Sequence, residues 1–202
     1  MYDSEHPTRK TLPAKCRSCN HPLDSPLFCG DCRTLHSAED CNYFELLGLA
    51  QSYKLDPAEL RRHYLNNSRN IHPDQHGEAD TNLSLRASAL LNEAYRVLVD
   101  PLLRAEYLLE EAGGQSARED KNVPQDVLIR TLMLREEIEE ARAARNEAAL
   151  DGYRQQIQQL REQAFVRIAE LAESLPGNKA SRRELRSYLN TAKYYQKLLD
   201  QL

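Results

Sequence analysis

Four cysteines near the start of the sequence have the residue type and the spacing of a metal site. Cys16 and Cys19 form one Cys-x-x-Cys pair, and Cys29 and Cys32 form a second pair nine residues later. Two such pairs, with turn-forming residues around them, let four thiolates converge on one ion. Because too few apolar residues lie between the pairs to form a core, metal binding would supply the folding free energy. The pattern predicts a structural zinc knuckle, with rubredoxin-like iron as the main alternative.

Other potential ligands near this set do not fit its spacing. Cys41 lies outside the pattern, and we expect it to be a partly buried thiol rather than a ligand. His21 and His36 could replace a cysteine, but nothing requires them, and they are left unassigned. Disulfides are disfavoured in the cytosol, and a redox Cys-x-x-Cys normally occurs singly at a helix N-terminus.

A second group with chemical potential is the tripeptide His72-Pro73-Asp74, which holds an imidazole and a carboxylate on either side of a fixed backbone. Because proline disfavours helical backbone in the residue before it, the periodic stretch 56–71 must end near His72. A tripeptide alone is weak evidence, since such pairs are usually ordinary surface residues. Its position between two amphipathic stretches favours an exposed turn. An enzymatic acid-base pair is disfavoured, because an exposed hairpin tip has no pocket that excludes water.

The segments around this turn have helical periodicity and recognisable ends. We expect helices over residues 43–49, 56–71, 83–98 and 102–109. The second and third would pair as an antiparallel hairpin with residues 72–74 at its tip. Three basic side chains of the second helix are free to face water: Arg61, Arg62 and Arg69.

Three long periodic segments follow a linker and begin at Pro124, which predicts a three-helix bundle. The first segment carries two apolar stripes when each residue advances about 100° around the helix. One stripe, from Val127 to Ala141, is enough to pack a bundle. The second consists of Leu128, Ile129, Leu132 and Met133 and is continued by Glu136 and Glu140. It must be covered by the fourth helix or by another protein, and periodicity favours neither. Tyr188 could extend the patch.

Composition limits the remaining function classes. The 202 residues are 29% charged with a net charge of -4, and no basic block is present, which argues against nucleic acid as the main partner. No run approaches the ~18 apolar residues of a membrane span. Residues 1–15 lack an export core and carry Asp3 and Glu5, so we expect a cytoplasmic protein. The sequence contains no phosphate loop, nucleophile elbow or His-Glu-x-x-His motif, so no motif indicates an enzyme.

Taken together, the motifs resemble the HscB-type J-domain co-chaperones of iron-sulfur cluster assembly over nearly the whole chain. Two motifs look specific to that type: Pro101-Leu102-x-Arg104-Ala105-x-Tyr107-Leu108-Leu109 and Leu134-Arg135-Glu136-Glu137. The resemblance implies an all-α, L-shaped molecule. Its parts would be an N-terminal segment with the four-cysteine knuckle (1–41), a J-domain (42–113), a linker (114–123) and a three-helix scaffold-binding bundle (124–202). Some family members carry a double Cys-x-x-Cys module like this one.

The resemblance also implies the partners. The J-domain would stimulate the ATPase of a DnaK/HscA-class chaperone through His72, Pro73 and Asp74, with Arg61, Arg62 and Arg69 as candidates for a positive docking face. The bundle would hold an IscU-type cluster scaffold protein, and its contact residues would be Leu128, Ile129, Leu132, Met133, Glu136, Glu140 and Tyr188. The chain itself would not be an enzyme.

The sequence departs from the family pattern in two places. Gln75-His76-Gly77 stands where a basic or aromatic pair is usual, and Met133 stands where an acidic residue is common. The first departure could weaken docking on the chaperone. The alternative function is a general J-domain co-chaperone of other clients, although the chain lacks the Gly/Phe-rich linker that this class often carries.

Overall fold

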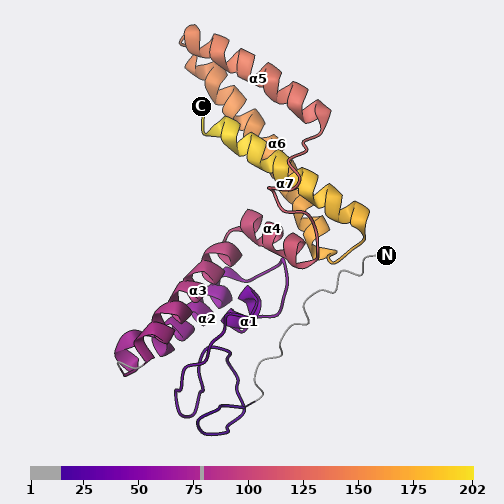
Figure 1. Cartoon of the computed structure of the whole chain (residues 1–202). Coiled ribbons are helices and arrows are strands. Elements are labelled where there is room, and N and C mark those ends of the chain that lie inside the picture. The colour runs from indigo at the N-terminus through magenta and orange to yellow at the C-terminus, as the bar shows by residue number, and fades with distance from the viewer. Residues whose placement is uncertain (1–14, 78–79) are drawn as a thin grey trace. The chain divides into compact units, whose positions relative to one another are not determined.

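The computed structural model describes residues 15–77 and 80–202, and these contain seven α-helices and one short 3-10 helix (Figure 1). The all-α class predicted from the sequence is confirmed, with two isolated β-bridges as the only extended pairing in the described residues. The chain divides into two compact units, and the boundary falls between Asp100 and Pro101. None of the described helices has the length and hydropathy needed to cross a membrane. The expectation about targeting in residues 1–15 concerns a segment of which residues 1–14 lie outside the described range.

The first unit contains the cysteine module and three helices. Its elements are α1 (Tyr43–Leu47), α2 (Pro57–Asn70), the 3-10 helix η1 (Pro73–Gln75) and α3 (Thr81–Val99). The first helix begins with a capping box, because the Asn42 side chain accepts from the Glu45 N–H and the Glu45 carboxylate accepts from the Asn42 N–H, both at 2.8 Å. It ends at Gly48, whose φ of +67° is accessible to glycine at little cost.

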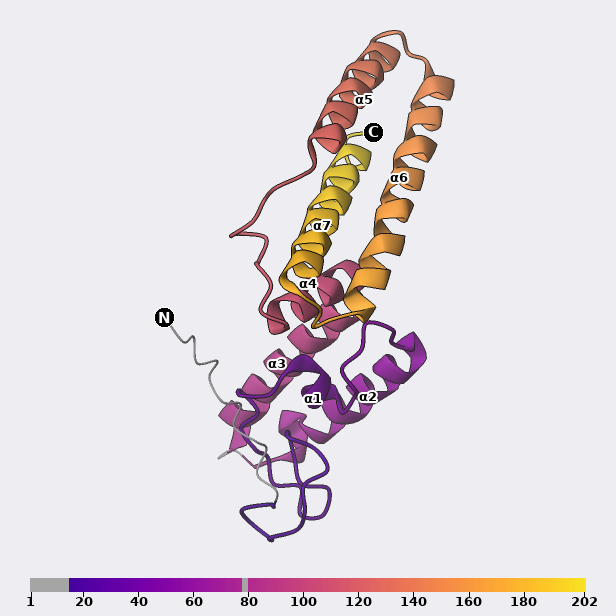
Figure 2. The same cartoon turned by 90° about the vertical axis from the view of Figure 1, so that its right-hand side faces the viewer.

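Helices α2 and α3 pack against each other and lie side by side (Figure 2). Each contributes an apolar face, with Leu60 of α2 and Leu91 of α3 both almost fully buried. At the border of this core the Tyr64 ring stacks on Tyr95 with 4.2 Å between centroids. The Tyr64 hydroxyl also donates to the Asn92 side chain at 2.8 Å. The predicted hairpin is therefore present, with residues 72–74 at its turn.

The second unit is built from four helices. They are α4 (Pro101–Glu111), α5 (Gln125–Ala143), α6 (Glu147–Glu173) and α7 (Lys179–Leu199). The last three form the predicted bundle, whose core includes Leu134, Ile138, Ile157, Tyr195 and Leu198. Asparagine side chains cap two of these helices, since Asn146 accepts from the Ala149 N–H and Asn178 from the Ser181 N–H. Helix α4 packs against α6 and α7, so it completes this unit.

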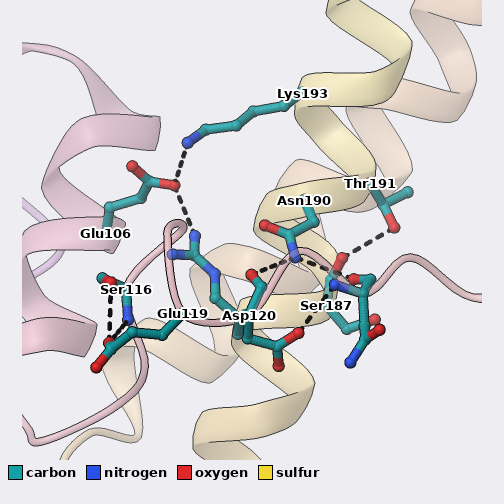
Figure 3. A network of polar contacts seen from close by, with 10 residues as sticks. Glu106, Ser116, Glu119, Asp120, Ser187, Asn190, Thr191 and Lys193 are labelled. Carbon is teal, nitrogen blue, oxygen red and sulfur yellow. Dashed lines mark hydrogen bonds and ion pairs between the residues drawn. The ribbon is translucent and has the colours of Figure 1, made fainter.

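Polar contacts fasten α4 and the segment after it to α7 (Figure 3). The Glu106 carboxylate of α4 accepts from Lys193 and from Arg186 of α7, both at 2.6 Å. The Asn190 amide donates to the main-chain carbonyls of Asp120 and Asn122 at 3.1 and 3.0 Å. Because Asn190 is only 6% exposed, these two carbonyls satisfy an amide that burial would otherwise leave unpaired.

The bundle core yields a stability prediction. Ile157 is fully buried in the bundle core, so Ile157→Ala should lower the free energy of unfolding by about 2–5 kcal/mol through lost burial and a residual cavity. Val166 lies on the same helix with 56% of its surface exposed, and Val166→Ala should change stability by less than about 0.5 kcal/mol. Urea unfolding followed by circular dichroism compares the two. Equal losses would show that the bundle core is not where the structure places it.

Candidate metal centre and binding surfaces

The cysteine module begins with a tight turn that carries the first pair of thiols. A β-bridge joins Lys15 to Pro22 and encloses Cys16 and Cys19. The residue after the second cysteine, Asn20, has a φ of +61°, a left-handed conformation that asparagine tolerates better than most residues. Within this turn Cys16 is buried and Cys19 is exposed.

The second pair lies in a turn that repeats this pattern position for position. Phe28 bridges to Leu35 and encloses Cys29 and Cys32, and Arg33, again the residue after the second cysteine, has the same φ of +61°. The sequence spacing alone did not indicate that the two turns share a backbone conformation. The module is therefore two copies of one turn whose cysteines face each other.

The four sulfur atoms lie close enough to share one ion. The Cys16 and Cys32 sulfurs are 3.6 Å apart and those of Cys19 and Cys29 are 3.7 Å apart, and all four lie within 4.8 Å of one another. Sulfurs around a tetrahedral zinc ion, with bonds of about 2.3 Å, are about 3.8 Å apart. The two contacts that join the turns match that separation, so the four cysteines are positioned to hold a metal ion.

Hydrogen-bond donors lower the pKa of Cys32, whereas neighbouring thiols raise the pKa of Cys19. The Thr34 hydroxyl and then its N–H lower the pKa of Cys32 to about 6, and the Ser18 N–H donates to the Cys16 sulfur. The His21 N–H acts to lower the pKa of Cys19, but shared hydrogen bonds with the other thiols, Cys32 first, and burial raise it to about 12. A cluster of thiols cannot ionise completely without a compensating cation, and a soft divalent ion supplies that charge.

The remaining candidate ligands lie outside the cluster. Cys41 is half-buried, as expected from the sequence, and burial, with smaller contributions from Glu45 and Asp40, raises the pKa of its thiol to about 11. His21 is exposed, whereas His36 is only 3% exposed. Burial, with Arg17 nearby, lowers the pKa of His36, which favours a neutral ring. Neither histidine belongs to the group of side chains that could share the ion.

The turn at residues 72–74 is exposed at its tip and anchored at both ends. Ile71 is fully buried, and its carbonyl accepts from the buried Ser84 hydroxyl of α3. The His76 ring donates to the Asn70 carbonyl at 2.7 Å and so closes the end of α2. This contact gives a structural role to one residue of the Gln75-His76-Gly77 departure.

Within the turn, the two ionisable side chains project into solvent. The His72 and Asp74 side chains are 57% and 84% exposed. Nδ1 of His72 accepts from the Asp74 N–H at 3.2 Å, which leaves the proton of the neutral ring on Nε2. The turn therefore presents a donor and a carboxylate side by side, on a backbone that Pro73 stiffens.

The three arginines predicted to face water on α2 are exposed. A hollow of about 460 Å³ runs along this helix between Arg62 and Arg69, and Leu65 lines it with 41% of its surface exposed. Leu65 was not among the residues selected from the sequence. Its position off the buried stripe of α2 was the signal that could have found it.

The second apolar stripe of α5 is exposed in the structure. The exposed fractions of its four side chains are 41% for Leu128, 53% for Ile129, 59% for Leu132 and 55% for Met133. Glu136 and Glu140 continue the stripe and are also exposed. Because Val127, Leu134 and Ile138 are buried on the other side, α5 packs into the bundle through one stripe only. The described residues of its own unit do not cover the other.

Tyr188 lies beside this stripe rather than on it. It lines a groove between α5, α6 and α7 that also contains Val127 and Arg130 of α5. The Arg167 guanidinium lies 5.9 Å from the centre of the Tyr188 ring, and Arg167 also pairs with Glu184 at 2.7 Å. Tyr188 is therefore held in a groove of mixed polar and apolar residues next to the apolar stripe.

Comparison with known proteins gives two family matches along the chain. The DnaJ domain family matches residues 42–107, and the HSCB C-terminal oligomerisation domain matches residues 123–202. The first match defines the class as a J-domain protein. The second match narrows that class to proteins with this particular C-terminal domain.

Individual relatives agree with these matches. The co-chaperone protein HscB homolog of Aliivibrio fischeri strain MJ11 is 33% identical over 136 residues, which cover 64% of this chain and 79% of the relative. The human iron-sulfur cluster co-chaperone protein HscB is 31% identical over 136 residues, which cover 63% of this chain and 58% of the relative. The chain belongs to the HscB family of J-domain co-chaperones.

Solved structures show the same fold. The crystal structure of human HscB matches with a TM-score of 0.76 at 25% identity, covering 93% of this chain and 95% of that one. HscB from Vibrio cholerae matches with a TM-score of 0.64 at 30% identity, covering 79% of this chain and 94% of that one.

The cysteine geometry predicts that loss of one of the four clustered thiols removes the metal ion, whereas loss of Cys41 does not. Cys29→Ser should reduce the metal content of the purified protein from about one ion per chain to near zero, because a tetrahedral site loses one of its four ligands. Cys41→Ser is the matched control and should retain the ion. Elemental analysis of both variants provides the measurement. Equal metal content in the two would contradict the assignment of the site to residues 16–32.

Proposed function

We propose that this protein binds an IscU-type iron-sulfur scaffold protein through its bundle and delivers it to a DnaK/HscA-class chaperone. It would stimulate the ATPase of that chaperone through the His72–Asp74 turn and so promote transfer of the cluster to recipient proteins. The observation that carries this proposal is the presence of two exposed surfaces, one on each unit, in a chain of the HscB family. The human relative is described as an iron-sulfur cluster co-chaperone.

The turn supports the chaperone half of the proposal. Its side chains are exposed while Ile71, Ser84 and His76 hold the backbone beneath them, so little conformational entropy is lost when a partner docks. Arg61, Arg62 and Arg69 add positive charge along α2, which speeds encounter with an acidic surface. The hydrolytic chemistry belongs to the chaperone, since the turn itself encloses no substrate.

The exposed stripe on α5 supports the scaffold half. Four apolar side chains in two helical turns form the kind of patch that soluble proteins expose at binding sites, and helix-borne anchors of this spacing fit an apolar surface. Glu136 and Glu140 at one end would favour a partner with basic residues at the matching edge. Tyr188 in the neighbouring groove would extend the contact.

We infer that the ion held by the four cysteines is zinc and that its role is structural. All four ligands come from the chain, which leaves no position for a water or substrate, and an all-thiolate tetrahedral set suits zinc. The metal would fix the two turns relative to each other, since the module has few buried apolar residues of its own. Iron could occupy the same donor set.

The turn gives a direct test. His72→Gln should abolish stimulation of the cognate chaperone's ATPase, because glutamine lacks the Nδ1 acceptor that binds the Asp74 N–H and orients the rigid ring. Gln75→Ala, in the same exposed turn, should retain most of the stimulation. Steady-state ATP hydrolysis by the chaperone measures both. Full stimulation by His72→Gln would contradict the assigned role of the turn, and scaffold binding by the variant should be unchanged.

The stripe on α5 gives the reciprocal test. Replacing Leu128 and Leu132 by alanine should weaken scaffold binding at least tenfold, since the loss of two buried anchors costs roughly 1–2 kcal/mol each. Val166→Ala removes a similarly exposed apolar side chain from α6 and should leave the affinity unchanged. Titration calorimetry with the purified scaffold distinguishes them. Unchanged affinity in the double variant would exclude the stripe as the binding surface.

A further inference from the structure

A basic hollow lies at the start of α7, away from the residues assigned to either partner. Its volume is about 430 Å³, within the range of small-ligand sites. The residues that line it are Gly113, Gly114, Gln115, Lys179, Arg182, Arg183 and Arg186. Four of these described residues are cationic and none is acidic. All belong to the second unit.

The feature that points to a ligand is the Arg186 side chain. It is 1% exposed, and one of its terminal nitrogens donates to the Glu106 carboxylate at 2.6 Å. The other two nitrogens, Nε and the second terminal nitrogen, are buried and have no hydrogen-bond partner among the described residues. A buried donor without an acceptor costs free energy. Because a guanidinium has donors only, only an acceptor atom can satisfy these two nitrogens.

The local charge does not balance without an added anion. Glu106 is shared between Arg186 and Lys193, so one carboxylate faces two cations. Arg182 donates to the carbonyls of Pro176 and Gly177 at 2.9 and 3.0 Å, which holds its guanidinium in the wall, and no carboxylate among the described residues pairs with it.

The helix itself adds to this positive potential. Lys179 and Arg183 are exposed in the first two turns of α7, a helix of 21 residues. The N-terminal end of a long helix carries the positive end of its dipole, and anions are stabilised there. Basic residues are ordinarily favoured at the opposite end of a helix, so a bound anion would offset the unfavourable concentration of positive charge at this end.

We propose that this hollow binds a phosphate group, either inorganic phosphate or the phosphate of a small ester. Its tetrahedral oxygens would accept from the unpaired nitrogens of Arg186, with Arg183 and Lys179 closing over the exposed side. Arginine suits this role because its planar fork matches oxyanion geometry. The site lies on the same unit as the α5 stripe but shares no residue with it, so phosphate binding is a property beyond the proposed scaffold delivery.

Titration calorimetry of the full chain with inorganic phosphate, at constant ionic strength set with sodium chloride, tests this directly. The wild type should show saturable binding. Arg183→Ala should weaken it about tenfold, because one charge-assisted hydrogen bond is lost. Arg135→Ala removes the same charge from an exposed position on α5 and should bind phosphate like the wild type. A parallel titration with adenosine monophosphate identifies the source, since tighter binding than inorganic phosphate indicates an ester and weaker or equal binding indicates the free ion.

A second variant tests the buried donor. Arg186→Lys keeps the charge and the ion pair with Glu106 but removes the guanidinium fork, and it should lose measurable phosphate binding. If circular dichroism shows that this variant does not fold, the comparison of Arg183→Ala with Arg135→Ala tests the proposal. Absence of saturable binding in the wild type, or equal affinity in the wild type and Arg183→Ala, would overturn the proposal.

Discussion

The packing of α2 against α3 is the interaction on which the turn at residues 72–74 depends. Proline ends α2 at the turn, and the buried Ile71 side chain fixes the point from which the turn departs. Ser84 of α3 then bonds the Ile71 carbonyl, so the turn cannot shift without opening the hairpin. The His72 and Asp74 side chains remain exposed above this support. The same packing therefore exposes the His72 and Asp74 side chains and buries Ile71 and Ser84, which support them.

The same division of faces explains the bundle. A helix between two neighbours can bury one wide stripe, and α5 has two. The stripe that includes Leu134 and Ile138 packs in the bundle core, which leaves the stripe from Leu128 to Met133 exposed. The cysteine module differs from the bundle in how it is stabilised. Its two turns bury Leu27 and Leu35 but few other large apolar side chains, and the proposed metal ion would add a cross-link between the turns.

Much of this arrangement could be predicted from the sequence. Period, caps and proline positions indicated the helices, the double Cys-x-x-Cys indicated the ligand set, and the helical wheel separated the stripes of α5. Periodicity indicates which face of a helix is buried but not which element packs against that face. The packing of α4 on α6 and α7, the exposed Leu65 and the unpaired donors of Arg186 all depend on tertiary contacts and could not be predicted. The domain limits at 42–113 and 124–202 and the roles of the site residues stay predictions.

The central claim is that one chain couples a scaffold to a chaperone. The most direct measurement is the steady-state ATPase rate of the chaperone with this protein alone, with the scaffold alone and with both at limiting concentrations. The account predicts that the two together stimulate hydrolysis more than the sum of their separate effects, and that this excess disappears when the α5 stripe is replaced. Stimulation by this protein that is indifferent to the scaffold would contradict the account and favour a general J-domain co-chaperone.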